Sequence, residues 1–269
     1  MTRDVYTHGH HESVLRSHSW RTAENSARYL LGPLRPGINL LDVGCGPGTI
    51  TVDFARRVAP GRVVGIDRSP DVVDQAKRHA ESAGVAVSIQ VADVYALEFP
   101  DASFDVVHAH QVLQHLTDPV AALREMRRVT RRGGTVAVRD SDYSCFSWAP
   151  LDPLLTRWLA VYRAVARQNG AEPDAGRFLK GWARAAEFLS VAVTSSTWIY
   201  ADAASCAWGE ISGRIAASTR LSESRLSVMA SRPATSSRRS RELGGSGPSI
   251  PTLSSPCCTA RYWRAFEPT

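Results

Sequence analysis

The sequence predicts an α/β protein, built as a doubly wound and mostly parallel sheet with additional helices. Two observations predict this class. From residue 38 onward, short apolar runs alternate with segments of helical periodicity. A turn dense in glycine also separates the first apolar run from the helix that follows it. Alternation of this kind is typical of parallel strands joined by right-handed helical crossovers.

The expected elements follow one another along the chain. A helix over residues 20–31 ends at Gly32-Pro33, since proline cannot continue a helix. Two later helices have clear starts at Ser69-Pro70 and Asp118-Pro119, which combine a capping side chain with a first-turn proline. We expect these two helices to end at Gly84 and at Gly133-Gly134. Strands are expected over residues 38–43, 62–67, 87–93, 104–110, 135–141 and 191–200, and further helices over 50–58, 152–169 and 177–190.

The glycine-dense turn Gly44-Cys45-Gly46-Pro47-Gly48 follows Asp42 in the first strand and opens a helix. Glycine lets the backbone approach a ligand closely, and a helix N-terminus offers free N–H groups. The second strand ends at Asp67, about one β-α-β unit further on, where a carboxylate can reach the hydroxyls of a ribose. The unit therefore predicts a site for a nucleoside cofactor.

The spacing argues against a dinucleotide as that cofactor. In the pyrophosphate fingerprint Gly-x-Gly-x-x-Gly/Ala the last small residue stands where this chain has Thr49, and Gly48 comes one place early. Asp42 would repel a pyrophosphate, whereas its charge suits a cationic ligand. An NAD-dependent oxidoreductase stays an alternative, and so does a catalytically inactive module that only binds a cofactor.

The motif Asp-Val-Gly-Cys-Gly-Pro-Gly and the acid-ended second strand resemble class I S-adenosylmethionine-dependent methyltransferases. Residues 38–141, and more loosely 6–208, are similar to the group that contains the ubiquinone/menaquinone C-methyltransferases. The resemblance implies a Rossmann-like fold, the cofactor S-adenosyl-L-methionine and a small-molecule acceptor. It further implies that the glycine turn wraps the methionyl part, that Asp67 holds the ribose, and that Asp93 and Val94 meet the adenine. From the residues alone, Asp93 could instead cap a helix.

The resemblance also places His110 and Gln111 beside the transferable methyl group, and an N-terminal lid over the cofactor. His110 is the candidate catalytic base and His115 a second one, because imidazole titrates near neutral pH, although each could merely line the pocket. Asp105, early in its strand, is expected to be structural. The full expected cofactor set is Asp42, Gly44, Cys45, Gly46, Gly48, Asp67, Arg68, Asp93, Val94, His110, Gln111, Arg21 and Tyr6.

No metal site is expected. His8, His10, His11 and His18 lack a strong ligand spacing and nearby cysteines, so we assign this histidine-rich segment to the lid. Arg21 could alternatively be a solvated helix residue. Cys45 is interpreted as a small side chain that the turn tolerates rather than as a nucleophile.

The charge distribution argues against a nucleic-acid substrate. Residues 1–209 carry 23 Lys/Arg and 22 Asp/Glu, whereas residues 210–269 carry nine and four, so that the basic excess lies in the tail. The Asn-Pro-Pro-Tyr type of motif found in DNA-base amino methyltransferases is absent after the fourth strand. The sequence contains no run of about 18 apolar residues, the length that a membrane-spanning helix needs. Five cysteines without a Cys-x-x-Cys pair, and an N-terminus of no signal-peptide type, indicate the cytoplasm.

We divide the chain into an N-terminal lid and helix (1–35), a cofactor-binding core (36–145), a helical substrate cap with the sixth strand (146–209) and a tail (210–269). The tail is rich in Ser, Arg, Gly and Pro. It shows no alternating apolar run for the antiparallel seventh strand that the family places between strands five and six. We therefore expect the last strand to be missing, and interpret the tail as a frameshifted translation; a natural disordered tail is the alternative.

Overall fold

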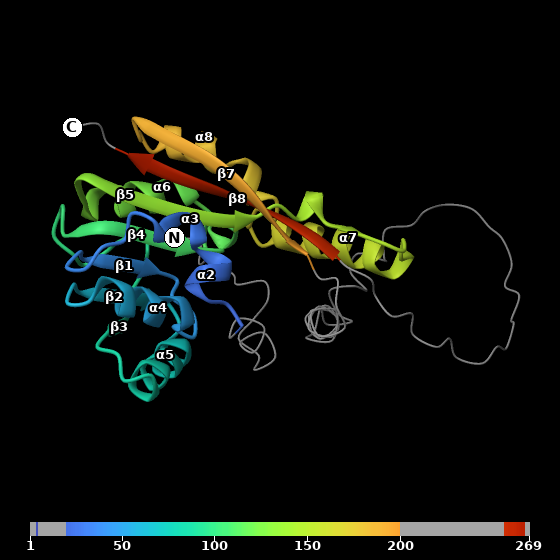
Figure 1. The fold of residues 1–269 in the computed structure, drawn as a ribbon. Coiled ribbons are helices and arrows are strands. Elements are labelled where there is room, and N and C mark those ends of the chain that lie inside the picture. The colour runs from blue at the N-terminus through green and yellow to red at the C-terminus, as the bar shows by residue number, and fades with distance from the viewer. Residues whose placement is uncertain (1–3, 5–19, 200–255, 267–269) are drawn as a thin grey trace, which may run out of the picture.

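The described part of the chain forms one twisted sheet covered by helices (Figure 1). The computed structural model describes residue 4, residues 20–199 and the backbone of residues 256–266. The strand order is β3-β2-β1-β4-β5-β8-β6, and β7 pairs with β8. Neighbouring strands from β3 through β5 are parallel. The expected doubly wound, mostly parallel class is confirmed.

Most of the elements expected from the sequence are present, and β6 and β8 are additional to them. The strands are β1 (Leu40–Val43), β2 (Val63–Asp67), β3 (Ser88–Val91), β4 (Phe104–His110), β5 (Thr130–Ser141), β6 (Ser147–Trp148), β7 (Ser190–Ile199) and β8 (Pro256–Phe266). The α-helices are α2 (Ala23–Ser26), α3 (Arg28–Leu31), α4 (Thr49–Val58), α5 (Pro70–Ser82), α6 (Pro119–Val129), α7 (Pro153–Gln168) and α8 (Leu179–Ala185). Short 3-10 turns are η1 (Leu113–His115), η2 (Tyr143–Cys145) and η3 (Ala175–Arg177).

Three expected helices have different limits. The helix over residues 20–31 is split into α2 and α3, because Ala27 has a non-helical φ of −129°. The start at Asp118 is confirmed, but α6 ends at Val129, ahead of the two glycines. Those glycines lie in an irregular part of β5, where a Cβ on Gly134 would stand 2.8 Å from the carbonyl oxygen of Asp105. Residues 177–190 form only the end of η3 and the short α8 before β7 begins.

The core lies on both faces of the sheet. Side chains alternate along a strand, so neighbouring residues point to opposite faces. Leu40 and Val106 pack with α2, α3 and α4, whereas Leu41 and Val107 pack with α6 and α8. Each leucine here is fully buried, which contributes about 1.5–3 kcal/mol to stability. Coverage of both faces is what a parallel sheet requires.

The last strand is present, which corrects the expectation that it is missing. β8 lies antiparallel between β5 and β7, with Thr135 opposite Phe266 and Ser190 opposite the same residue. The prediction failed because it looked for strict alternation of apolar residues. Main-chain groups make the ladder, and Thr259 with the three aromatic residues of this segment favours an extended chain without such alternation. The frameshift and disorder interpretations of residues 210–255 lie outside the described residues.

The division of the chain at residues 35, 145 and 209 stays a prediction. Residues 256–266, however, belong to the central sheet and not to a separate tail. β6 pairs with the first two residues of β8, and β5 pairs with residues 260–266 of the same strand.

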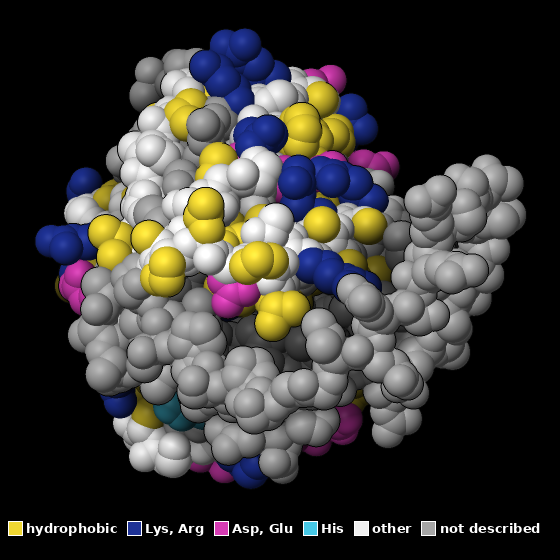
Figure 2. Space-filling model, turned by 90° about the vertical axis from the view of Figure 1, so that its right-hand side faces the viewer, with side chains coloured by type: hydrophobic (Ala, Val, Ile, Leu, Met, Phe, Trp, Pro, Cys, Tyr) yellow, Lys and Arg dark blue, Asp and Glu magenta, His cyan; other side chains and the backbone are white. Residues whose placement is uncertain are grey.

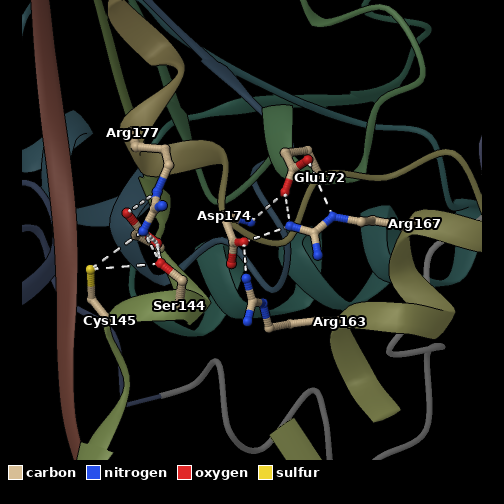
Figure 3. Close-up of polar contacts among 8 residues, drawn as sticks. Ser144, Cys145, Arg163, Arg167, Glu172, Asp174 and Arg177 are labelled. Atoms are coloured by element: carbon tan, nitrogen blue, oxygen red, sulfur yellow. Dashed lines mark hydrogen bonds and ion pairs between the residues drawn. The ribbon is translucent and has the colours of Figure 1, made fainter. Parts of the chain in front are cut away.

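Arginine–carboxylate pairs fasten α7 and η3 to the end of β5 (Figure 3). Arg163 and Arg167 of α7 each place an Nη2 atom 2.5 Å from Oδ2 of Asp174. Arg177 donates through Nε and Nη2 to the two oxygens of Asp142, at 2.9 Å each. Burial alone would raise the pKa of Asp174, but hydrogen bonds from the two arginines and their charges outweigh it and lower the pKa below its usual value.

Helix α7 projects beyond the sheet, and Figure 2 shows the molecule from that side. Hydrophobic and basic side chains are interspersed over the described part of this face (Figure 2). Leu151, just ahead of α7, and Leu154, in its first turn, are 88% and 76% exposed. Among the residues that the structure describes, no helix has the length and apolar character needed to cross a bilayer.

Candidate functional site

The site lies where the order of the strands reverses. β1 is flanked by β2 on one side and β4 on the other, so the loops that leave the carboxyl ends of β1 and β4 diverge. Ligands of open α/β sheets bind in the crevice at such a point. A cavity of about 790 Å³ is found there, bounded by the loops that follow β1, β2, β3 and β4. Its volume lies within the roughly 300–1,000 Å³ of small-molecule and cofactor sites.

The cavity brings together most of the residues expected to bind the cofactor. Those that line it are Arg21, Asp42, Gly44, Cys45, Gly46, Asp67, Arg68, Asp93, Val94, His110 and Gln111. Tyr6 lies outside the described residues, as do the histidines of the N-terminal segment. Gly48 does not line the cavity. Its φ is +82°, and a Cβ there would stand 3.1 Å from Cβ of Ala76, so this glycine lets α4 pack closely on α5.

The glycine turn is shaped by backbone that other residues rarely adopt. Gly44 and Gly46 have φ values of +64° and +55°. A Cβ on Gly44 would collide with Val112, whereas a Cβ on Gly46 would meet no atom within 4 Å. Since Gly46 lines the cavity, a side chain at this position would occupy space that is now open to a ligand.

Asp67 stands at the end of β2 with both oxygens held by main-chain donors. The N–H of Gly46 donates to Oδ2 at 3.2 Å, and the N–H of Ser69 donates to Oδ1 at 3.0 Å. The first of these bonds ties the glycine turn directly to the carboxylate. Asp93 accepts the N–H of Tyr95 at 3.0 Å and closes a turn; no helix begins there, so its alternative role as a helix cap is wrong.

Asp42 is buried beneath the turn and is satisfied from within the protein. Its Oδ2 accepts a hydrogen bond from the Thr51 hydroxyl at 2.6 Å, and its Oδ1 lies 2.7 Å from Nδ1 of His108.

Burial raises the pKa of the Cys45 thiol well above its usual value, and the nearby carboxylates of Asp42 and Asp67 raise it further. The thiol is thus held protonated, which fits the expectation that it is no nucleophile.

His110 and Gln111 form the floor of the cavity at the end of β4. The His110 ring is 7% exposed and lies parallel to that of His108, with 6.5 Å between centroids. It also lies 6.0 Å from the ring of Trp198 in β7. Gln111 has a φ of +56°, and its amide bridges Arg21 and Ser141 at 2.7 and 2.9 Å. The second candidate base, His115, lines the cavity as well.

Asp105 lies at the opposite end of β4, as expected for a structural residue. Its Oδ2 accepts the N–H of Asn39 at 2.6 Å, and its Oδ1 pairs with Arg131 at 2.5 Å. Asp105 and its two partners do not line the cavity. Among the described residues there is no group of three or more His, Cys, Asp or Glu that could hold a metal ion.

Asp4 is a cavity residue that the sequence did not reveal. Its Oδ1 accepts hydrogen bonds from the Thr117 N–H at 2.9 Å, the Thr117 hydroxyl at 2.7 Å and the Tyr95 hydroxyl at 3.3 Å. Its carbonyl oxygen accepts a bond from Arg68 at 2.8 Å. Asp4 therefore ties the loops after β2, β3 and β4 together. Its separation of 113 positions from Thr117 left no local signal.

A second missed residue is Asp140, near the end of β5. It is completely buried, and burial raises its pKa to about 8 although the Gln114 N–H donates to Oδ1 at 3.0 Å. Within the described part of the chain, its Oδ2 has no hydrogen-bond partner. The available signal was an acid two residues after the apolar run Val136-Ala137-Val138 of β5.

Comparisons with known proteins agree on one family. A family model described as a methyltransferase domain matches residues 34–186. An uncharacterised methyltransferase of Schizosaccharomyces pombe is 37% identical over 214 residues, which is 76% of each chain. The ubiquinone/menaquinone biosynthesis C-methyltransferase of Bdellovibrio bacteriovorus is 36% identical over 104 residues, 39% of this chain and 44% of that protein. Among solved structures, phosphoethanolamine N-methyltransferase 2 of Haemonchus contortus, bound to S-adenosylhomocysteine, has a TM-score of 0.60 at 14% identity, covering 96% of this chain and 58% of that one.

Proposed function

We propose that this chain, which belongs to the methyltransferase domain family, transfers the methyl group of S-adenosylmethionine to a small-molecule acceptor. The family and the cofactor expected from the glycine turn are confirmed, and the dinucleotide reading is set aside. One observation carries the proposal for the site. The glycine turn and the acid of the second strand share one cavity and are joined by the bond from Gly46 to Asp67.

The residues present fit the cofactor. The open space at Gly46 and the left-handed turn leave room for its amino-acid part beside the backbone. In this proposal Asp67 accepts hydrogen bonds from the ribose hydroxyls, and Asp93 and the Val94 N–H bind the adenine; the presence of all three residues in the cavity lining supports these roles. Arg68 and Asp42 contribute charge at the cavity wall, where Asp42 would favour a cation over a neutral ligand.

When bound, the cofactor supplies a methyl group on a positively charged sulfur, which is already activated for displacement. The task of the chain is therefore to align the acceptor with that methyl group and to exclude water. His110, nearly buried at the end of β4, is the group we assign to take a proton from a hydroxyl or an acidic carbon. An amine acceptor would not need this base.

A small-molecule acceptor is favoured by the balanced charge of the chain ahead of its tail, with 23 Lys/Arg and 22 Asp/Glu over residues 1–209. A small-molecule acceptor is also in keeping with the Bdellovibrio relative, a C-methyltransferase of ubiquinone/menaquinone biosynthesis. We place the enzyme in the cytoplasm, because Cys45 and Cys145 are free thiols and the odd count of five cysteines suits a reducing compartment. No nucleic-acid or membrane partner forms part of this proposal.

The proposal is tested by calorimetric titration of the full chain with S-adenosylmethionine and, separately, with NAD. We expect saturable one-to-one binding of the former alone. Asp67→Ala should weaken binding by about 1–3 kcal/mol, since charge-assisted bonds to the ribose are lost. Asp71→Ala, which removes an exposed acid four residues further on, is the matched control and should bind as the unmodified chain does. Absence of heat with S-adenosylmethionine would contradict the proposal, and equal binding by Asp67→Ala would contradict the ribose assignment.

A further inference from the structure

We propose that Gln111 is a positioning residue, which holds the guanidinium of Arg21 in the cavity so that it binds the carboxylate of the cofactor's amino-acid part. The inference rests on the proposed function, because it assumes that the cavity holds S-adenosylmethionine. It assigns to Gln111 a role that it performs through Arg21.

The backbone of Gln111 is the first indication. Its φ of +56° lies in the left-handed region, which costs a residue with a side chain about 1 kcal/mol and costs glycine nothing. Its N–H donates to the carbonyl of Arg139 at 2.6 Å, so the turn itself is held by the main chain. Glycine would satisfy this turn at lower cost, and the glutamine must therefore be explained by its side chain. Strained residues of this kind gather at functional sites.

The side chain of Gln111 is fixed at both ends. Arginine has only donors, so the atom that faces Nη2 of Arg21 at 2.7 Å must be the amide oxygen. The amide nitrogen is then directed to the hydroxyl of Ser141, to which it donates at 2.9 Å. Ser141 is 6% exposed at the end of β5. The amide thus has one possible orientation, and it anchors Arg21 to the carboxyl end of β5.

The amide is also the right partner for an arginine that must bind an anion. It is neutral, so this contact orients the guanidinium without cancelling its charge. The guanidinium carries five donors in a planar fork, which matches the two oxygens of a carboxylate. A glutamate at position 111 would keep the hydrogen bond but would compete with the ligand as an anion. Arg21 lines the same cavity as Gly44 and Gly46, the part that we assign to the amino-acid end of the cofactor.

The experiment compares two ligands that differ only in that end. S-adenosylhomocysteine carries the carboxylate, whereas 5′-methylthioadenosine keeps the nucleoside and the thioether and lacks the amino-acid part. For Gln111→Gly we expect an unchanged or higher melting temperature, since glycine suits the left-handed backbone. The same variant should raise the Kd of S-adenosylhomocysteine about tenfold and leave that of 5′-methylthioadenosine within about twofold.

Two further variants sharpen the test. Arg21→Met should raise the Kd of S-adenosylhomocysteine at least as much as Gln111→Gly does. Adding Gln111→Gly to Arg21→Met should cause no further loss of affinity, because the two residues act as one unit. Gln111→Glu should also weaken the binding of S-adenosylhomocysteine but not that of 5′-methylthioadenosine, because its added negative charge repels the carboxylate.

Three outcomes would overturn the inference. Equal loss of both ligands in Gln111→Gly would mean that the glutamine only supports the cavity. Unchanged S-adenosylhomocysteine affinity in Gln111→Gly and Gln111→Glu would mean that Arg21 needs no positioning. If the unmodified chain bound neither ligand, the inference and the proposed function would fail together, whereas in the first two cases the proposed function would stand.

Discussion

Two regions of the described molecule, the cofactor crevice and the segment beyond β5, are held together in different ways. On the side of β1, β2 and β3, the structure relies on buried apolar side chains and on main-chain bonds, with Asp67 held by two backbone N–H groups. Beyond β5, the acids Asp142 and Asp174 are held by arginines whose side chains are 31–44% exposed. Screening by salt does not weaken apolar burial, whereas ion pairs with exposed partners weaken as salt rises. We therefore expect the first region, the cofactor side, to be rigid, and the second, which lies mostly in the predicted substrate cap and is called the acceptor side, to be adjustable.

The largest effect should come from the glycine turn. Gly46→Val is expected to weaken S-adenosylmethionine binding by about a thousandfold or more (~4 kcal/mol), because the side chain fills the space reserved for the ligand. Calorimetry measures the loss. Gly84→Val is the matched control, since Gly84 has a φ of +64° with open space around its Cβ but lies away from the cavity. Both variants should lose a similar amount of folding stability. Normal binding by Gly46→Val would contradict the assignment of this space to the cofactor.

Asp140 tests the boundary between the two sides, since it is buried without the arginine that Asp142 has. Its pKa rises to about 8 in the folded chain because of burial, against about 4 when unfolded. Between these values the folded state holds the additional proton, so its contribution to stability is complete below pH ~4 and is lost as the pH rises toward 8.

Asp140→Asn imitates the protonated acid and escapes that loss. We expect it to be more stable than the unmodified chain by on the order of 3 kcal/mol at pH 8, with the difference vanishing near pH 4. Urea denaturation at several pH values measures this. A variant that is less stable at pH 8, or a difference that does not change with pH, would show that Asp140 is ionised in the folded chain.

The arginine cluster of the acceptor side should show a smaller and salt-dependent effect. Asp174→Asn removes the acid that two arginines of α7 share, and we expect a loss of about 2 kcal/mol in the free energy of unfolding at low salt. The loss should shrink in high salt, because the arginines are exposed to solvent. Cofactor affinity should stay within about twofold. Glu187→Gln, which alters a pair whose acid is 72% exposed, is the control and should cost much less.

The smallest expected effect concerns Asp4, which adds polar ties to the otherwise rigid cofactor side. Asp4→Ala removes the acceptor shared by Tyr95 and Thr117, so bound S-adenosylmethionine should dissociate about fivefold faster, equivalent to ~1 kcal/mol. Stopped-flow displacement measures the rate, with the exposed Asp74→Ala as control. An unchanged rate would mean that these contacts do not restrain the cofactor.

Most of the cofactor side could be predicted from the sequence because its signals are local. The turn around Gly44 and Gly46, the acid that ends β2, and the start of α6 at Asp118 each depend on a few adjacent residues. The one misplaced member of the expected set, Gly48, has the same left-handed backbone as its neighbours. Sequence spacing alone does not distinguish a glycine that faces a ligand from one that faces another helix.

What the sequence did not reveal depends on distant contacts. Asp4 reaches the cavity only because the fold brings Thr117 to it, and the burial of Asp140 depends on how η1 and η3 pack over the end of β5. The left-handed conformation of Gln111 could not be predicted from the residue type, since glutamine has no preference for it. β8 was missed because its residues do not alternate strictly; its extended form depends on the ladders with β5 and β7, which lie more than fifty residues away along the chain.

The position of β8 also decides when the molecule can be completed during synthesis. This strand leaves the ribosome after β5 and β7, yet it lies between them. The nascent chain can assemble β1 to β4 early. Until residue 266 has emerged, β5 keeps one edge without a partner, and β7, which among the described strands pairs with β8 alone, has no strand partner. Open edges of this kind pair readily with other chains. Chains that stop ahead of residue 256 are therefore expected to aggregate even though every residue of the cofactor crevice has already been made.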